Sequence, residues 1–178
     1  NWGQTPILMD RMNGEQREIL LADADVLIDY VRSNLSILGL VASYTGPLYL
    51  LRQVLESVDG LTRTRCRRHG ISVIEAETDM LVKAGARSGP LSFDDWLCYL
   101  HCEQHGWTCV TNDRSLIKAC KKGGVAYRRG LRLMVDLVAN GHLTRAKALR
   151  TARAVHKINS LHINKQVLDE FIKALDEK

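Results

Sequence analysis

Aspartates follow apolar segments of this chain at places where a metal ion would find several oxygen ligands. The segment LLADADVLIDY places Asp23, Asp25 and Asp29 directly behind a short apolar run. Asp95 lies at the start of an amphipathic segment, and Asp113 ends the run WTCVTND. Carboxylates that share one site repel one another, and Mg²⁺ and Mn²⁺ prefer oxygen ligands. The set therefore indicates divalent-metal chemistry.

Each acid also has a purely structural interpretation, because Asp is a preferred helix N-cap. Asp25 and Asp113 precede helical patterns, and Ser92 with Asp95 forms a Ser-x-x-Asp pair typical of a capping box. Capping leaves Asp23 unexplained, since a carboxylate at the end of a buried strand is costly without a partner and tends to protonate. Taken singly, each acid remains open to the capping interpretation; taken together, the acids favour a metal.

Short apolar segments alternate with segments that have apolar residues at three- and four-residue spacing. The predicted strands are 19–22, 46–51, 70–76, 106–113 and 123–128. The predicted helices between them are 25–33, 35–43, 52–59, 77–84, 92–105 and 114–122. This alternation is typical of an α/β fold, here a three-layer α/β/α sandwich with a mostly parallel sheet of about five strands. Ligands of such sheets bind beyond the carboxyl ends of the strands, where Asp23, Asp95 and Asp113 are expected to meet.

Strand signals stop after Arg129, and three helical segments follow at 131–140, 144–158 and 164–176. The second carries Arg and Lys around two thirds of its circumference, which predicts a surface helix. We expect one folded unit: an N-terminal extension at 1–18, an α/β domain at 19–130, and a C-terminal helical extension at 131–178 packed on the same domain.

Composition supports a single domain that binds a polyanion. The chain has 178 residues, 46% of them hydrophobic, and a net charge of +5. From Arg114 to Lys165 the only acid is Asp136. This basic part of the chain would suit a polyanion such as a nucleic acid. A solvated basic face without a ligand remains an alternative.

The cysteines and the apolar runs suggest where the protein acts. Five cysteines form an odd count in a chain that can bury an ordinary core, so a disulfide framework is not expected. No apolar run approaches the length of a membrane span, and residues 1–18 lack the apolar stretch of a secretory signal. We expect a protein of the reducing cytoplasm that does not bind membranes.

Three motifs, in order, resemble those of PIN-domain nucleases. Asp23-Ala-Asp25-Val-Leu-Ile-Asp29 is similar to the first motif, in which an apolar strand ends in Asp, a small residue, and then Asn, Ser or Asp. Leu-Ser-Phe-Asp-Asp-Trp at 91–96 resembles the third, Leu-Ser-x-x-Asp, and Thr-Asn-Asp-Arg-Ser-Leu at 111–116 the fourth, Thr-x-Asp before a helix. The resemblance covers about 19–128, and the tail matches the toxin-type, VapC-like PIN proteins only loosely.

The resemblance implies a PIN-like nuclease domain at 19–130 that uses Mg²⁺ or Mn²⁺. It makes catalytic metal ligands of Asp23, Asp95 and Asp113, and supporting residues of Asp25, Ser92, Thr111 and Asn112. Its second motif requires a Glu on the helix after the second strand. Between Tyr30 and Val58 the only carboxylate is Glu56, which we expect to be the fourth catalytic acid. In other alignments Gln53 or Ser57 takes this position, and the site has one charge fewer.

The implied activity is endonucleolytic hydrolysis of RNA phosphodiester bonds. A bound divalent ion lowers the pKa of a water molecule and neutralises charge on the phosphoryl group. Four basic residues near the expected rim are candidates for holding the flanking phosphates of the RNA: Arg114, Lys118, Arg128 and Arg129. The resemblance further implies the toxin of a bacterial type II toxin–antitoxin pair, with a cognate antitoxin protein as partner and a homodimer as the expected assembly.

Two other functions remain open on the sequence. A degenerate PIN domain that has lost its glutamate would act as an RNA- or partner-binding module. A haloacid-dehalogenase-like phosphatase also has Asp-x-Asp at the end of a strand, as in Asp23-Ala-Asp25, but Leu27 and the Ser-x-x-Asp motif fit that family poorly.

The remaining chemically capable residues have simpler interpretations. Cys98, Cys102 and His105 share a helical face that suits zinc, but small buried cysteines are the favoured interpretation. The basic run at 62–70 is either a nucleic-acid contact or a solvated connection. Trp96 and Trp107 are expected to pack rather than to stack on bases. The histidines at 101, 105, 142, 156 and 162 show no nucleophile-and-base arrangement and receive no role.

Overall fold

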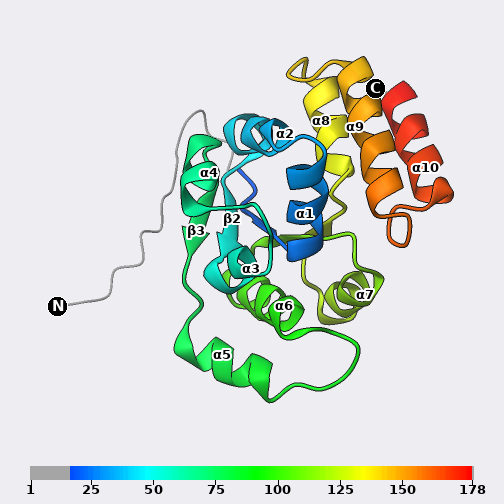
Figure 1. Ribbon diagram of the computed structural model, residues 1–178. Helices are drawn as coiled ribbons and strands as arrows, with labels where there is room; N and C mark the ends of the chain where they lie inside the picture. Colours follow the sequence, from blue (N-terminus) through cyan, green and yellow to red (C-terminus); the bar gives the residue numbers. More distant parts are fainter. Residues whose placement is uncertain (1–16, 178) are drawn as a thin grey trace.

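A five-stranded parallel sheet forms the centre of the computed structural model, which describes residues 17–177 (Figure 1). The strands are β1 (Leu20–Ala22), β2 (Leu48–Leu51), β3 (Ser72–Ile74), β4 (Thr108–Val110) and β5 (Tyr127–Arg128), in the order β3-β2-β1-β4-β5. Every neighbouring pair is parallel. The predicted fold class is therefore confirmed. The extension predicted at 1–18 lies outside the described residues as far as residue 16.

Helices cover both faces of the sheet. The first group is α1 (Ala24–Arg32), α2 (Ser36–Leu40), the π-helical turn η1 (Val41–Thr45), α3 (Arg52–Glu56) and α4 (Arg63–Arg68). The second is α5 (Thr78–Gly85), α6 (Phe93–His105) and α7 (Arg114–Gly123). The chain moves outward from β1 to β3 and returns through β4 to β5, and right-handed crossovers then place the two groups on opposite faces. In Figure 1, α5, α6 and α7 gather at the bottom, away from α2 and α4.

Helix α4 replaces the connection expected at 62–70. Thr62 caps it by accepting a hydrogen bond from the Arg65 amide, at 3.2 Å. Cys66 is its buried residue, while Arg63, Arg67 and the other basic side chains stay at the surface. The sequence signal was obscured because a helix of six residues that buries one side chain shows almost no apolar periodicity.

The core explains the cysteines and the tryptophans. All five cysteines are buried and free, and Cys98 and Cys102 of α6 pack under the sheet. Among the described residues, no cysteine belongs to a group of side chains placed to share a metal ion. Trp96 and Trp107 pack against the core, as predicted. The Trp107 ring also stacks on Tyr49, with centroids 4.9 Å apart.

Three C-terminal helices pack against one another: α8 (Arg132–Ala139), α9 (Arg145–Ile158) and α10 (Lys165–Asp176). Helix α9 contacts α1, α8 and α10. Its buried face consists of small residues and one valine, namely Ala148, Thr151, Ala152 and Val155. The helix predicted to lie at the surface thus exposes its basic face and packs through a narrow face of small side chains.

A buried carboxylate joins this tail to the sheet domain. Asp29 of α1 is 2% exposed, and the Asn159 side-chain amide at the end of α9 donates to its two oxygens, at 3.1 and 3.2 Å. Asn112, after β4, donates to the same carboxylate at 3.1 Å. Burial raises the pKa of Asp29 to about 6, although the two amide donors oppose that shift. The third acid of the DADVLID segment is therefore an anchor for the tail.

Within the part of the chain that the structure describes, no single helix is long and apolar enough to cross a membrane. The pair formed by α1 and the α2–η1 segment passes that test together, by length and composition only, and is bent by 115°.

We expect Asn159→Ala to lower the free energy of unfolding by about 1–3 kcal/mol, because it removes donors from a buried carboxylate. Asn140→Ala is the matched control. Its side chain bonds an exposed carbonyl at the end of α8, and its loss should change stability by only about 0.5 kcal/mol. Urea unfolding measures both. Equal stability of the two variants would contradict the anchoring role of Asn159.

Candidate metal centre

Three of the predicted acids cap helices, and each does so without using all of its carboxylate oxygens. The Val26 amide donates to Asp23 Oδ1 at 2.9 Å, and the Leu116 amide to Asp113 Oδ1 at 2.7 Å. Asp95 completes the capping box of α6, in which Oδ2 accepts from the amide and the hydroxyl of Ser92. The capping interpretation holds for Asp113 and for the capping box of Asp95, but the cap of α1 is Asp23, for which we had expected none. Capping is compatible with metal binding, because Asp23 and Asp113 keep Oδ2 and Asp95 keeps Oδ1 outside these caps. Asp25 lies in the first turn of α1 and is not its cap.

The carboxylates face a common space beyond β1 and β4. These strands are neighbours with Ala22 opposite Val110, so their carboxyl ends place Asp23 and Asp113 at one edge of the sheet. Burial raises the pKa of Asp95, as do the charges of Asp113 and Asp25. Asp23 in turn is influenced by the charges of Asp25 and Asp95. Asp23, Asp25, Asp95 and Asp113 thus lie near enough to influence one another's charge, and we refer to them as the acid group; within it, Asp25 and Asp113 have ligand atoms within 4.8 Å of each other.

Asp23 is the most constrained member of this group. It is 1% exposed, and its Oδ2 is buried with no hydrogen-bond partner among the described residues. Burial raises its pKa well above the usual range, the nearby charges of Asp25 and Asp95 add to this, and hydrogen bonds from Thr111 and Val26 oppose it. A buried, partnerless carboxylate oxygen beside other carboxylates fits a divalent cation with oxygen ligands.

His162 joins the group from the loop between α9 and α10, although the sequence showed no reason to select it. Its Nε2 lies 3.8 Å from Asp25 Oδ2, and its Nδ1 lies 3.9 Å from Asp113 Oδ2. Each of these three residues offers one ligand atom within 4.8 Å of the others, a spacing that suits a shared metal ion. A single histidine in SLHIN carries no local pattern, so only the docking of the tail reveals it.

The predicted supporting residues contact the acids or hold their loops. Thr111 is buried beside Asp23 and lowers the pKa of that carboxyl, and its hydroxyl accepts from the Asp113 amide at 3.0 Å. Ser92 bonds Asp95 in the capping box. Asn112 donates to Asp29 and accepts from the Gly130 amide at 2.9 Å. It therefore holds the segment after β5 and the anchoring carboxylate of Asp29, and it makes no hydrogen bond to Asp23, Asp25, Asp95 or Asp113 among the described residues.

The structure does not bring Glu56 to the group. Its side chain is 62% exposed and forms an ion pair with Arg52, one turn earlier on α3. Gln53 and Ser57 occupy another face of α3, where the Ser57 hydroxyl donates to Asp94 at the start of α6 and Gln53 Oε1 is buried. Residues four apart share a helix face, and the face toward α6 therefore carries an amide and a hydroxyl instead of a carboxylate.

Two of the four predicted phosphate contacts are available at the surface. Arg114 and Lys118 are exposed, and they lie one turn apart on α7, which Asp113 caps. Arg128 is committed elsewhere, because it forms ion pairs with Glu18 at 2.8 Å and with Asp136. Arg129 is half-buried, and its Nη1 has no partner among the described residues. Arg128 is thus a structural cation rather than a free phosphate contact.

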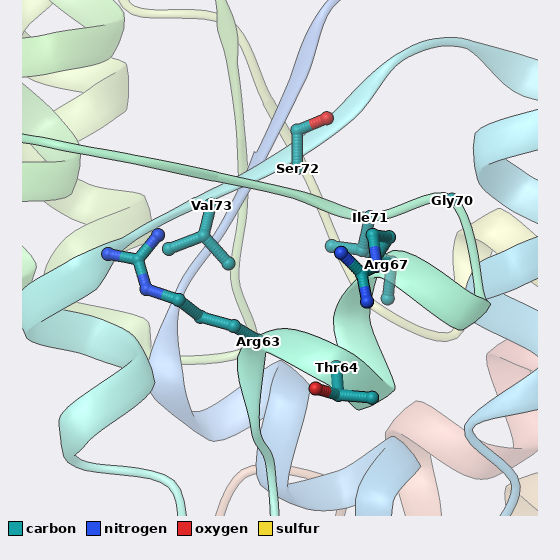
Figure 2. Close-up of a pocket in the computed structure, with 7 residues that line it drawn as sticks. All are labelled: Arg63, Thr64, Arg67, Gly70, Ile71, Ser72 and Val73. Carbon is teal, nitrogen blue, oxygen red and sulfur yellow. The ribbon is translucent and has the colours of Figure 1, made fainter.

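A separate basic hollow of about 440 Å³ lies at the edge of β3 (Figure 2). Arg63, Thr64 and Arg67 of α4 line it together with the segment from Gly70 to Val73. None of the acids described above lines it. Strands β3 and β5 are the two edges of the sheet, so the hollow and the α7 side lie at opposite edges.

Comparison with known proteins yields a structural similarity but no match of sequence families. No protein-family model matches the chain, and no curated protein matches it. Among solved structures, the chain is similar to a PilT N-terminus domain protein from the hyperthermophilic archaeon Sulfolobus solfataricus. The TM-score is 0.49 at 10% sequence identity, over 66% of this chain and 92% of that one. A similarity at this level carries no information about activity. Any indication of activity must therefore come from the side chains of this chain, above all from its acids.

We expect Asp23→Asn to stabilise the metal-free protein near neutral pH. The raised pKa means that the folded wild type binds more protons than the unfolded chain, so its stability falls as pH rises from about 4 through the folded pKa. Asn still caps the helix but carries no charge. The variant should therefore be more stable than wild type by at least about 1 kcal/mol at pH 7, with the difference vanishing below about pH 4.

Chemical unfolding between pH 3 and pH 8 in the presence of a chelator measures this difference. Asp23→Ala is the control: it lacks both the charge and the cap, so it should be less stable than Asp23→Asn by about 1 kcal/mol at every pH. Parallel pH curves for wild type and Asp23→Asn would show that the Asp23 carboxylate is not strained.

Proposed function

We propose that this chain is a metal-dependent endoribonuclease of the PIN type that hydrolyses RNA phosphodiester bonds. The carrying observation is that Asp23, Asp95 and Asp113, each at the start of a different helix, belong to a set of acids that influence one another's charge, and that one of them has a buried carboxylate oxygen without a partner among the described residues. These three are also the acids of the motifs that resemble the PIN family. The proposal therefore joins a motif resemblance to a donor set that suits Mg²⁺ or Mn²⁺.

The residues of the chain prepare a rigid set of oxygen ligands. Each carboxylate is held at a helix N-terminus, where backbone N–H groups and the helix dipole favour negative charge. Thr111 orients Asp23, and Ser92 orients Asp95. Asp25 and Asp113, whose ligand atoms lie within 4.8 Å of each other, would hold the cation together with Asp23 and Asp95. When bound, the ion would supply a water of lowered pKa and neutralise charge on the phosphoryl group.

Substrate RNA would lie over α7. Arg114 and Lys118 present two cations beside the N-terminus that Asp113 caps, and Lys121 and Lys122 add charge at the other end of the same helix. Contacts with phosphates position a nucleic acid without reading its sequence. This arrangement of positive charges would fit the phosphate backbone of a single-stranded RNA that passes from the acids along α7.

The biological role that we propose for this ribonuclease is that of a cytoplasmic toxin in a bacterial type II toxin–antitoxin pair. It is supported by the likeness of the three motifs to those of PIN proteins. The partners in this role are RNA and a cognate antitoxin protein, and the assembly is a homodimer.

A second candidate is a degenerate PIN module that binds RNA or a partner without cleaving. The favouring observation is the second motif, where Glu56 points to solvent and Gln53 and Ser57 occupy the face toward α6. One charge fewer weakens the hold on a divalent ion. Metal affinity separates the two candidates.

The test of the proposed function is RNA cleavage by Asp113→Asn. The substitution retains the cap but removes a ligand charge, so Mn²⁺-dependent cleavage should fall by at least about 100-fold. Glu56→Gln is the control, and its activity should stay within about twofold of wild type because the side chain is exposed and paired on α3. Cleavage of a labelled RNA with and without chelator provides the measurement. Unchanged cleavage by Asp113→Asn would exclude this site.

RNA affinity should weaken when Arg114 and Lys118 are both changed to Gln. Loss of two phosphate contacts reduces the slope of log affinity against log salt by about 1.4 for single-stranded RNA. The control is Arg63→Gln with Arg67→Gln, a pair of the same spacing in the hollow at β3, where Arg63 also forms an ion pair with Glu75 at 2.9 Å (Figure 2). Fluorescence anisotropy at several salt concentrations measures both slopes. A larger loss for the control pair would move the RNA to the β3 edge.

A further inference from the structure

We infer that His162 is a nitrogen ligand of the cation in this acid group, and that the site consequently prefers Mn²⁺ to Mg²⁺. The inference rests on the proposed function for the presence of a metal. It goes beyond that proposal by adding a ligand from the C-terminal extension, outside the part of the chain that resembles PIN nucleases.

The distances around His162 fit ligands of one ion better than direct hydrogen bonds. Its nitrogens lie 3.8 Å from Asp25 Oδ2 and 3.9 Å from Asp113 Oδ2, which is too far for hydrogen bonding. Two ligands at about 2.1 Å from one ion are separated by about 3 Å when adjacent and about 4.2 Å when opposite. An ion between the ring and either carboxylate therefore fits these separations.

Two buried atoms here also lack partners. Both His162 Nδ1 and Asp23 Oδ2 are inaccessible and make no hydrogen bond with the described residues. The side chain of His162 as a whole is 19% exposed, and Asp23 is 1% exposed. A buried polar atom without a partner in a native structure points to an ion or a water molecule that satisfies it. Both atoms belong to residues that face the same group of carboxylates.

The loop that carries His162 is held in place. Asn159 Oδ1 accepts from the His162 amide at 3.4 Å, and Asn159 O accepts from the Ile163 amide at 2.8 Å. Ile163 is fully buried, and its carbonyl bonds His156 Nδ1. Through Asp29, the same Asn159 is tied to α1, the helix that bears Asp25. The position of His162 relative to Asp25 is thus determined by one connected hydrogen-bond network.

An imidazole ligand changes which ion the site takes. Mg²⁺ is a hard cation that favours carboxylate and water oxygens, whereas imidazole suits transition-metal ions. With two carboxylates and one imidazole, the group of Asp25, Asp113 and His162 has a mixed oxygen and nitrogen donor set. Mn²⁺ accepts both donor types, and its affinity should depend on His162 much more than the affinity for Mg²⁺.

The experiment titrates Mn²⁺ and Mg²⁺ into the full chain and into His162→Ala by calorimetry. We expect His162→Ala to weaken Mn²⁺ binding by at least about tenfold and Mg²⁺ binding by less than about threefold. His142→Ala is the matched control. This exposed histidine stacks on Tyr44 before the start of α9, about 21 Å of helix away from the His162 loop. The control should leave both affinities unchanged.

Pulsed electron paramagnetic resonance of Mn²⁺ bound to the wild type gives a readout that does not depend on the folding of any variant. Coupling to a ¹⁴N nucleus is expected in the wild type and in His142→Ala, and it should vanish in His162→Ala. Mn²⁺ binding without nitrogen coupling, with equal affinity in His162→Ala, would overturn the inference and leave the nuclease proposal standing. Failure of the wild type to bind either ion would overturn both.

Discussion

The carboxylate of Asp23 is the constraint around which the rest of the site is arranged. It lies where the central strand β1 ends, is almost fully buried, and must be satisfied within a few ångströms of its own backbone. One oxygen starts helix α1, Thr111 after the neighbouring strand supplies a second contact, and the other oxygen is left without a protein donor. A negative charge in such a place is unfavourable for the isolated fold, and it is this unfavourable charge that makes the position suitable for a cation.

Capping and the proposed metal binding draw on the same aspartates. A carboxylate has two oxygens, and a helix N-terminus needs only one of them. In Asp23 and Asp113 the cap uses Oδ1, and in Asp95 it uses Oδ2. The cap also fixes the rotamer of the side chain, so the remaining oxygen points in a defined direction. Three helices that start at one edge of the sheet thereby supply a preorganised donor set.

The C-terminal helices complete this edge rather than only adding bulk. Asn159 ties the end of α9 to Asp29 of α1, and the following loop places His162 beside Asp25 and Asp113. The basic character of this half of the chain is divided between roles. Arg128 neutralises Glu18 and Asp136 inside the fold, whereas Arg114 and Lys118 remain at the surface of α7. Net charge alone does not distinguish these roles, because each depends on which partner lies within reach.

The sequence by itself determined the α/β alternation and the acids that start the helices. These features depend on neighbours within one turn, as in Ser92 with Asp95 or Asp113 with Leu116, and such local contacts are visible as spacing. The tertiary structure alone decided that Ser57, and not Glu56, contacts α6, since a rotation by one residue around this short helix would put Glu56 in the place of Ser57. It alone placed Asn159 on Asp29, 130 positions away, and His162 on the acids. Contacts of that separation follow from how the tail packs, and no periodicity in the chain encodes them.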